Sequence, residues 1–209
     1  MARSARFSTS LEANGEGETD LKGWARYLIC GLAGILAGCG AAVWAVRAGA
    51  FGSNTPIGAW STGTDFGTAE ANAHTRAVVA LRGLLALPAR EARYYTAAID
   101  DAGRPLEGRC RYAVSGGDVA GAWWSLTLYD RQGYLVANAA NIYSVESAAV
   151  PDRTRWTAAV APDRQPGAWL PTGGKGRFEL TLRVYLPNDG GRGNLTAAQL
   201  PRIVRQDCA

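Results

Sequence analysis

Histidine is almost absent from this 209-residue sequence, which contains His74 and no other. With only four cysteines beside it, the chain has little material for the His- and Cys-rich sites that hold transition metals. A Ser–His–Asp triad would have His74 as its only base, and the Gly-x-Ser-x-Gly nucleophile motif does not occur. We therefore predict no metal site, no cofactor and no catalytic residue that such patterns identify.

An excess of one charge is also missing. The net charge is only +4, and the basic residues are scattered, so we predict no nucleic-acid partner. Hydrophobic residues make up 47% of the chain and charged residues 19%, which is enough apolar material for a folded core. The 26 Gly and 9 Pro favour a turn-rich β body over a long helical bundle.

One long uncharged run stands out, from Tyr27 to Val46 between Arg26 and Arg47. As a helix, its twenty residues would be about 30 Å long, the thickness of a bilayer's hydrocarbon core. The first twenty residues after the run contain one basic residue, whereas the tail before it contains Arg3, Arg6, Lys22 and Arg26. This bias predicts a single-pass protein of a bacterial inner membrane, with a cytoplasmic N-terminus and a periplasmic C-terminal domain.

The run has two alternative fates, cleavage and lipidation. It is longer than the apolar region of about 7 to 15 residues typical of a cleaved signal peptide, which disfavours cleavage. The sequence Leu36-Ala37-Gly38-Cys39 resembles a bacterial lipobox, in which Cys39 would be lipidated and become the new N-terminus. The run stays apolar after Cys39, so we favour a retained anchor, and lipidation is the alternative.

Small residues recur every four positions within the run, at Cys30, Gly34, Gly38 and Ala42. They would share one helix face, against which a second transmembrane helix can pack closely. Because Gly and Ala are frequent in membrane helices in general, the alternative is that this face has no specific partner.

The sequence divides into a tail, a span, a Gly-, Pro- and Ser-rich lead-in linker and an exported domain, at residues 1–26, 27–46, 47–70 and 71–209. At the start of the exported domain, apolar residues recur at helical spacing from Ala71 to Leu87 and stop at Pro88. This predicts one amphipathic helix that packs on a sheet.

After Pro88 the hydrophobic period changes to two, which predicts strands in a β-sandwich. FELTLRVYL has an apolar core face and a second, polar face. The predicted core face comprises Phe178, Leu180, Leu182, Val184 and Leu186, and the other face comprises Glu179, Thr181, Arg183 and Tyr185. The predicted strands are Arg93–Ile99, Cys110–Ser115, Trp123–Asp130, Tyr134–Asn138, Arg155–Ala161, Gly176–Leu186 and Arg202–Arg205.

Cys110 and Cys208 are the only cysteines outside the membrane run. An exported domain in an oxidising compartment commonly pairs such residues, so we predict a disulfide between them. It would clamp the C-terminal strand to the sheet.

Aromatic and amide side chains gather on the polar faces of the predicted strands and in the loop between them. Flat rings suit the C–H faces of sugar-like or other small polar ligands, and amides suit hydroxyl groups. The alternative is that these side chains pack under a helix or a loop. The predicted ligand site comprises Trp123, Tyr129, Asn138, Asn141, Tyr143, Arg183 and Tyr185.

Two stretches, WWSLTLYDRQGYLVANAANIYSV from Trp123 and GAWLPTGGKGRFELTLRVYLP from Gly167, resemble the bacterial domain-of-unknown-function family twelve-fourteen. The resemblance runs from about Ile99 to Val204 and implies a jelly-roll-like β-sandwich and an exported location. This chain looks like the short, membrane-anchored form of that family. No activity or catalytic residue comes with the resemblance.

The overall prediction is a mainly β protein: one transmembrane helix, then a jelly-roll-like sandwich with one packed α-helix. We expect it to act as a non-enzymatic envelope module that binds a ligand or assists another protein. One alternative is an accessory subunit that docks on an inner-membrane complex through its transmembrane helix. The other alternative is an enzyme that acts on envelope glycans or esters.

Overall fold

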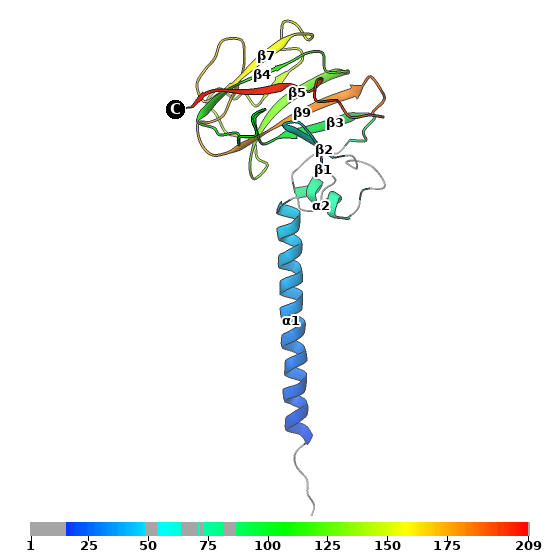
Figure 1. Ribbon diagram of the computed structural model, residues 1–209. Coiled ribbons are helices and arrows are strands. Elements are labelled where there is room, and N and C mark those ends of the chain that lie inside the picture. The colour runs from blue at the N-terminus through cyan, green and yellow to red at the C-terminus, as the bar shows by residue number, and fades with distance from the viewer. Residues whose placement is uncertain (1–15, 49–53, 64–70, 72, 82–86, 209) are drawn as a thin grey trace, which may run out of the picture. The chain divides into compact units, whose positions relative to one another are not determined.

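The computed structural model describes residues 16–48, 54–63, 71, 73–81 and 87–208, and the chain divides into two compact units, Met1–Ala48 and Gly49–Ala209. The first unit contains helix α1, Glu16–Ala48 (Figure 1). Its stretch Gly23–Ala45 is long and apolar enough to cross a membrane, which fits a single-pass anchor or a signal sequence. Within this helix, every residue from Trp24 to Trp44 is exposed.

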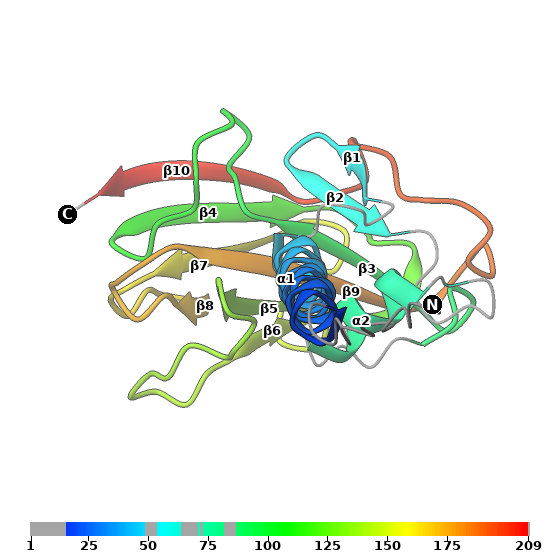
Figure 2. The same ribbon diagram turned by 90° about the horizontal axis from the view of Figure 1, so that it is seen from below.

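The second unit is mainly β, with two sheets, as predicted. The six-stranded sheet has the order β1-β2-β3-β9-β5-β6, with bounds Asn54–Ile57, Trp60–Gly63, Ala92–Ala97, Phe178–Pro187, Gly121–Asp130 and Ser144–Glu146. The four-stranded sheet has the order β10-β4-β7-β8, with bounds Arg202–Cys208, Cys110–Gly116, Trp156–Ala161 and Ala168–Pro171. Neighbouring strands are antiparallel except β7 and β8, which are parallel, and β10 runs beside β4 in Figure 2.

One hydrophobic core lies between the two sheets in a sandwich-like arrangement. Alternation along β5 and β9 sends Trp124, Leu126, Leu180 and Leu182 inward, and all four are fully buried. From the other sheet, Trp156 stacks on Trp124 with ring centroids 4.4 Å apart. The core also contains Tyr112, Val114, Val160, Leu170 and Ile203.

The segment 47–70, which we expected to be an extended linker, is instead partly integral to the sheet. Its β1 and β2 form an antiparallel hairpin, and Ser61 pairs with Thr96 of β3. Trp60 is buried in the core, where its Nε1–H donates to the carbonyl of Pro201 at 2.7 Å. The Gly-, Pro- and Ser-rich composition of this segment is typical of linkers, but part of the segment forms a strand pair. The buried side chain of Trp60 attaches this pair to the domain.

A predicted strand and a predicted helix also differ from the structure. Residues 134–138 do not form a strand: Leu135 makes one isolated bridge to Tyr129, and the chain then turns at Asn138. The predicted helix of Ala71–Leu87 is present as α2, Ala73–Leu81, and residues 82–86 lie outside those described. Its packing on a sheet stays a prediction.

The predicted disulfide is confirmed. Cys110, at the start of β4, is bonded to Cys208, at the end of β10, and the two are paired in the register of these neighbouring strands. It clamps the C-terminal strand to the four-stranded sheet, as predicted. Cys30 and Cys39 are free and exposed on α1.

Candidate functional site

The six-stranded sheet turns a polar and aromatic surface away from the core, here called the outer face. Because side chains alternate along a strand, the residues between the buried core positions of β5 and β9 all point to this side. Cross-strand pairing sets them in rows: Trp123 beside Tyr185, Ser125 beside Arg183, Thr127 beside Thr181 and Tyr129 beside Glu179.

Arg183 is the fixed cation of the outer face. Its Nη1–H donates to Thr127 Oγ1 at 3.1 Å, and its Nη2–H donates to Tyr129 Oη at 2.6 Å. The guanidinium carbon also lies 5.4 Å from the centre of the Tyr129 ring, within the range of a cation–π contact. No carboxylate of the described residues forms an ion pair with this half-buried arginine.

An aromatic pair lies next to this cation. The rings of Trp123 and Tyr185 are 5.0 Å apart and tilted by 50°, and both side chains are partly exposed. Since Tyr185 follows Arg183 by two residues on the same strand, the pair and the guanidinium share one face. We call Trp123, Thr127, Tyr129, Arg183 and Tyr185 the Arg183 cluster.

The middle of the outer face is covered. Ser125, Thr127 and Thr181 are only 3–6% exposed. On β3, Tyr94 is buried as well, and its Oη accepts a hydrogen bond from the N–H of Leu87 at 3.3 Å. Burial raises the pKa of Tyr94, and this hydrogen bond offsets part of the rise. The accessible part of the face is therefore the partly exposed Arg183, Tyr129 and aromatic pair.

The structure places the other three predicted ligand residues in the connection between β5 and β6. The amide of Asn138 donates to the carbonyls of Val136 and Ile142 at 3.1 and 2.9 Å, and its Oδ1 accepts the N–H of Ile142 at 3.1 Å. Asn141 has a positive φ of 53° and accepts the hydroxyl of Tyr143 at 3.4 Å. In the described part of the chain, no hydrogen bond or ring contact joins these three to the Arg183 cluster, and Asn138 serves the turn itself.

Asp100 is the most buried carboxylate that the structure describes, and its contacts tie it to the loop before β4. Its Oδ1 accepts the N–H groups of Ala102 and Arg104 at 3.0 and 2.9 Å, and its Oδ2 lies 2.9 Å from the Arg104 guanidinium and 3.5 Å from Arg205. Burial alone would raise the pKa of Asp100, but these hydrogen bonds and charges hold it below its ordinary value. In the described part of the chain, no three His, Cys, Asp or Glu residues come close enough to hold a metal.

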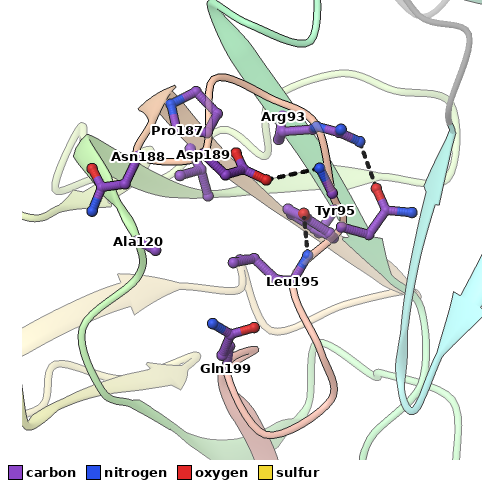
Figure 3. Close-up of a pocket in the computed structure, with 11 residues that line it drawn as sticks. Arg93, Tyr95, Ala120, Pro187, Asn188, Asp189, Leu195 and Gln199 are labelled. Carbon is purple, nitrogen blue, oxygen red and sulfur yellow. Dashed lines mark hydrogen bonds between the residues drawn. The ribbon is translucent and has the colours of Figure 1, made fainter.

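A pocket of about 220 Å³, which sequence reasoning missed, lies where β3 and β9 meet the loop of residues 188–199 (Figure 3). Arg93 is buried in its wall, donates to Asn194 Oδ1 at 2.5 Å and to the carbonyl of Gly191, and has a buried Nε without a partner. The signal for this pocket was a charged residue at the core-facing position of a predicted strand, two residues before Tyr95. The other lining residues are Ala120, Val184, Pro187, Asn188, Asp189, Gly193, Leu195 and Gln199.

Two solved structures align with part of this chain. The VPA0106 protein from Vibrio parahaemolyticus aligns over 66% of this chain and 36% of its own, with a TM-score of 0.52 and 22% identity, so the likeness shows the fold alone. The aligned part thus spans little more than a third of that protein. An uncharacterized protein from Burkholderia cenocepacia aligns over 57% of this chain and 30% of its own, with a TM-score of 0.39 and 17% identity.

No curated protein matches the sequence. A family model does match: it covers residues 91–189, which contain β3 to β9 and the whole Arg183 cluster, and its description is "Protein of unknown function". This confirms the resemblance drawn from the motifs beginning at Trp123 and Gly167. Residues 91–189 of this chain thus match the model of the uncharacterised domain family DUF1214.

Proposed function

We propose that this protein is a membrane-anchored, non-enzymatic binding module of the bacterial envelope. In this proposal α1 holds the chain in the inner membrane, the sandwich lies in the periplasm, and the Arg183 cluster binds a small, hydroxyl-rich ligand that carries a negative charge.

The anchor is supported by the length and ends of α1. Its apolar stretch, Gly23–Ala45, has 23 residues, whereas the apolar region of a signal peptide has about 7 to 15. Trp24 and Trp44 are exposed near the two ends of its apolar stretch, and twenty residues of helix separate them by about 30 Å. Aromatic residues at both ends of a span match the two membrane–water interfaces. The disulfide fits an oxidising compartment outside the cytoplasm.

The binding role rests on one observation: Arg183 is held by Thr127 and Tyr129 and has no carboxylate partner among the described residues. A guanidinium kept in place by neutral hydroxyls retains its full charge for an anion and is already oriented to bind one. The adjacent rings of Trp123 and Tyr185 offer a surface for the apolar face of a sugar ring. A uronic acid combines these two features, a carboxylate and a ring with C–H faces.

The test uses the full chain in detergent and compares glucuronate with uncharged glucose. We expect glucuronate to bind more tightly, and Arg183→Gln to weaken glucuronate at least tenfold while leaving glucose unchanged. Tyr129→Phe, which removes one hydroxyl that positions Arg183, should have a smaller effect in the same direction. Lys175→Gln removes an equal charge at an exposed site outside the cluster and is the matched control. Equal affinity of the Arg183→Gln variant and the unchanged protein for glucuronate would contradict the proposal.

A role as an accessory subunit is the second candidate. A Cβ added at Gly34 or Gly38 of α1 would meet no atom within 4 Å, so this face has room for a partner helix. Co-purification of a membrane protein in mild detergent, lost on Gly34→Leu and kept on Gly40→Leu, would favour this role. Gly40 is the control because it lies on the other side of the helix and is equally uncrowded. Turnover of envelope glycans by the purified protein would instead favour an enzyme.

A further inference from the structure

We propose that the pocket beside Arg93 is a second binding site, separate from the Arg183 cluster, and that it takes a small monocarboxylate. Arg93 and Val184 line it from the core side of β3 and β9, whereas Arg183 points to the opposite side of the same sheet. The two sites can therefore be tested independently.

The charge of Arg93 carries the argument. The side chain is nine-tenths buried, and the acceptors it reaches, Asn194 Oδ1 and the carbonyl of Gly191, are both neutral. None of the described carboxylates makes an ion pair with it. The buried Nε of Arg93 has no hydrogen-bond partner among the described residues, so a carboxylate that reaches it would satisfy a buried cationic donor. Carboxylates match the planar fork of a guanidinium.

A second charged residue of the lining limits the charge of the ligand. Asp189 lines the pocket, and its two carboxylate oxygens accept the N–H groups of Gly191 and Gly193 at 2.8 and 2.7 Å. These hydrogen bonds, aided by the charge of Arg93, lower the pKa of Asp189, so the group is ionised at neutral pH. A dianion such as phosphate would be repelled by it, whereas a monoanion can lie against Arg93.

Size and lining define the rest of the ligand. At about 220 Å³ the pocket is smaller than sites for drug-sized ligands, which start at about 300 Å³. Ala120, Val184 and Leu195 give it an apolar side, and the amides of Asn188 and Gln199 give it hydrogen-bonding groups (Figure 3). A carboxylate on a short apolar body fits this combination.

The experiment measures the thermal unfolding of the full chain in detergent, followed by tryptophan fluorescence, with sodium propionate as the probe. Inorganic phosphate and sodium chloride at equal ionic strength are the comparisons. We expect propionate to raise the Tm by about 3–5 °C at ten times its Kd. Phosphate and chloride should give no such rise, and Arg183→Gln should leave the propionate effect unchanged.

Two variants fill or line the pocket without touching Arg93. Ala120→Leu occupies its volume, and Gln199→Leu changes an exposed lining residue whose Oε1 accepts hydrogen bonds from Thr196. Both should abolish the propionate effect, whereas Ala122→Leu, the same substitution at an exposed position on β5, should keep it. An equal Tm rise with phosphate, no rise with propionate, or a full rise in both pocket variants would overturn the proposal.

Discussion

Cys110 and Cys208 are bonded across neighbouring strands although they lie 98 residues apart in the sequence. The bond closes a loop that contains β4 to β10, which is the whole four-stranded sheet and β5, β6 and β9 of the other sheet. Because β10 is an edge strand that pairs only with β4, the bond also prevents the end of the chain from separating from the sheet. The disulfide thus constrains the same part of the chain that carries the Arg183 cluster.

Removing this bond should lower stability substantially. For a closed loop of about 100 residues, the chain-entropy model gives at most about 4.7 kcal/mol, and measured losses are typically about 2–4 kcal/mol. We expect a loss in that range for the Cys110→Ser, Cys208→Ser double variant in urea unfolding. Cys30→Ser, Cys39→Ser changes two free thiols and is the control. Equal midpoints for both double variants would show that the bond does not stabilise the domain.

Asp100 should make the free energy of unfolding depend on pH in the acidic range. Its pKa is lower in the folded protein than the ordinary value of 3.8, so its contribution is complete above that pH and is lost as the pH falls through the folded pKa. Asp100→Asn should cost about 1–3 kcal/mol at pH 7, because it leaves the largely buried Arg205 and the half-exposed Arg104 without the carboxylate charge. The difference from the unchanged protein should narrow below pH 4. A difference that stays constant from pH 7 to pH 3 would contradict this account.

Gly191 should be far less replaceable than its neighbour Gly190. Both have positive φ angles, 74° and 65°, so alanine strains the backbone at either position. A Cβ at Gly191 would also overlap the carbonyl group of Ala89, whereas one at Gly190 would meet nothing. We expect Gly191→Ala to cost at least about 1–2 kcal/mol more than Gly190→Ala in thermal unfolding. Similar losses would mean that the loop moves away from Ala89 freely.

Asn138 should act on stability rather than on binding. Its side chain makes three hydrogen bonds within the β5–β6 connection, so Asn138→Ala should destabilise the protein by about 1–2 kcal/mol. We expect the affinity for glucuronate to be unchanged at a temperature where the variant is folded. If the variant bound glucuronate more weakly without a loss of stability, Asn138 would be a ligand-binding residue instead.

The long strands were predictable because their hydrophobic pattern is strong. From Phe178 to Tyr185 the predicted inward and outward residues of β9 are those observed, because eight residues give four repeats of the two-residue period. The prediction for Leu186 was wrong: it was expected to face the core, but it is 60% exposed and has a positive φ of 46°, so the alternation ends before it. The strands β6 and β8 have only three and four residues, too few for a period to appear. Val136 resembles a strand residue because it is apolar, yet the hydrogen bonds of Asn138 turn the chain there.

The candidate sites, like the strands, were predictable only in part. Strand alternation was enough to predict that Trp123, Tyr129, Arg183 and Tyr185 share a face. The sequence could not show that Tyr129 and Thr127 hold the guanidinium, because that contact depends on the register between β5 and β9. The pocket depends on a loop that folds back from residue 188 onto Arg93, a contact between residues about 100 positions apart.

The anchored periplasmic module is tested most directly by determining on which side of the membrane the C-terminal domain lies. Alkaline phosphatase, active only in the periplasm, and a fluorescent protein that matures only in the cytoplasm would each be fused after residue 209 of the full chain in a bacterial host. We predict an active phosphatase and no fluorescence, with both signals in the membrane fraction. A fluorescent fusion without phosphatase activity would contradict the anchored periplasmic module.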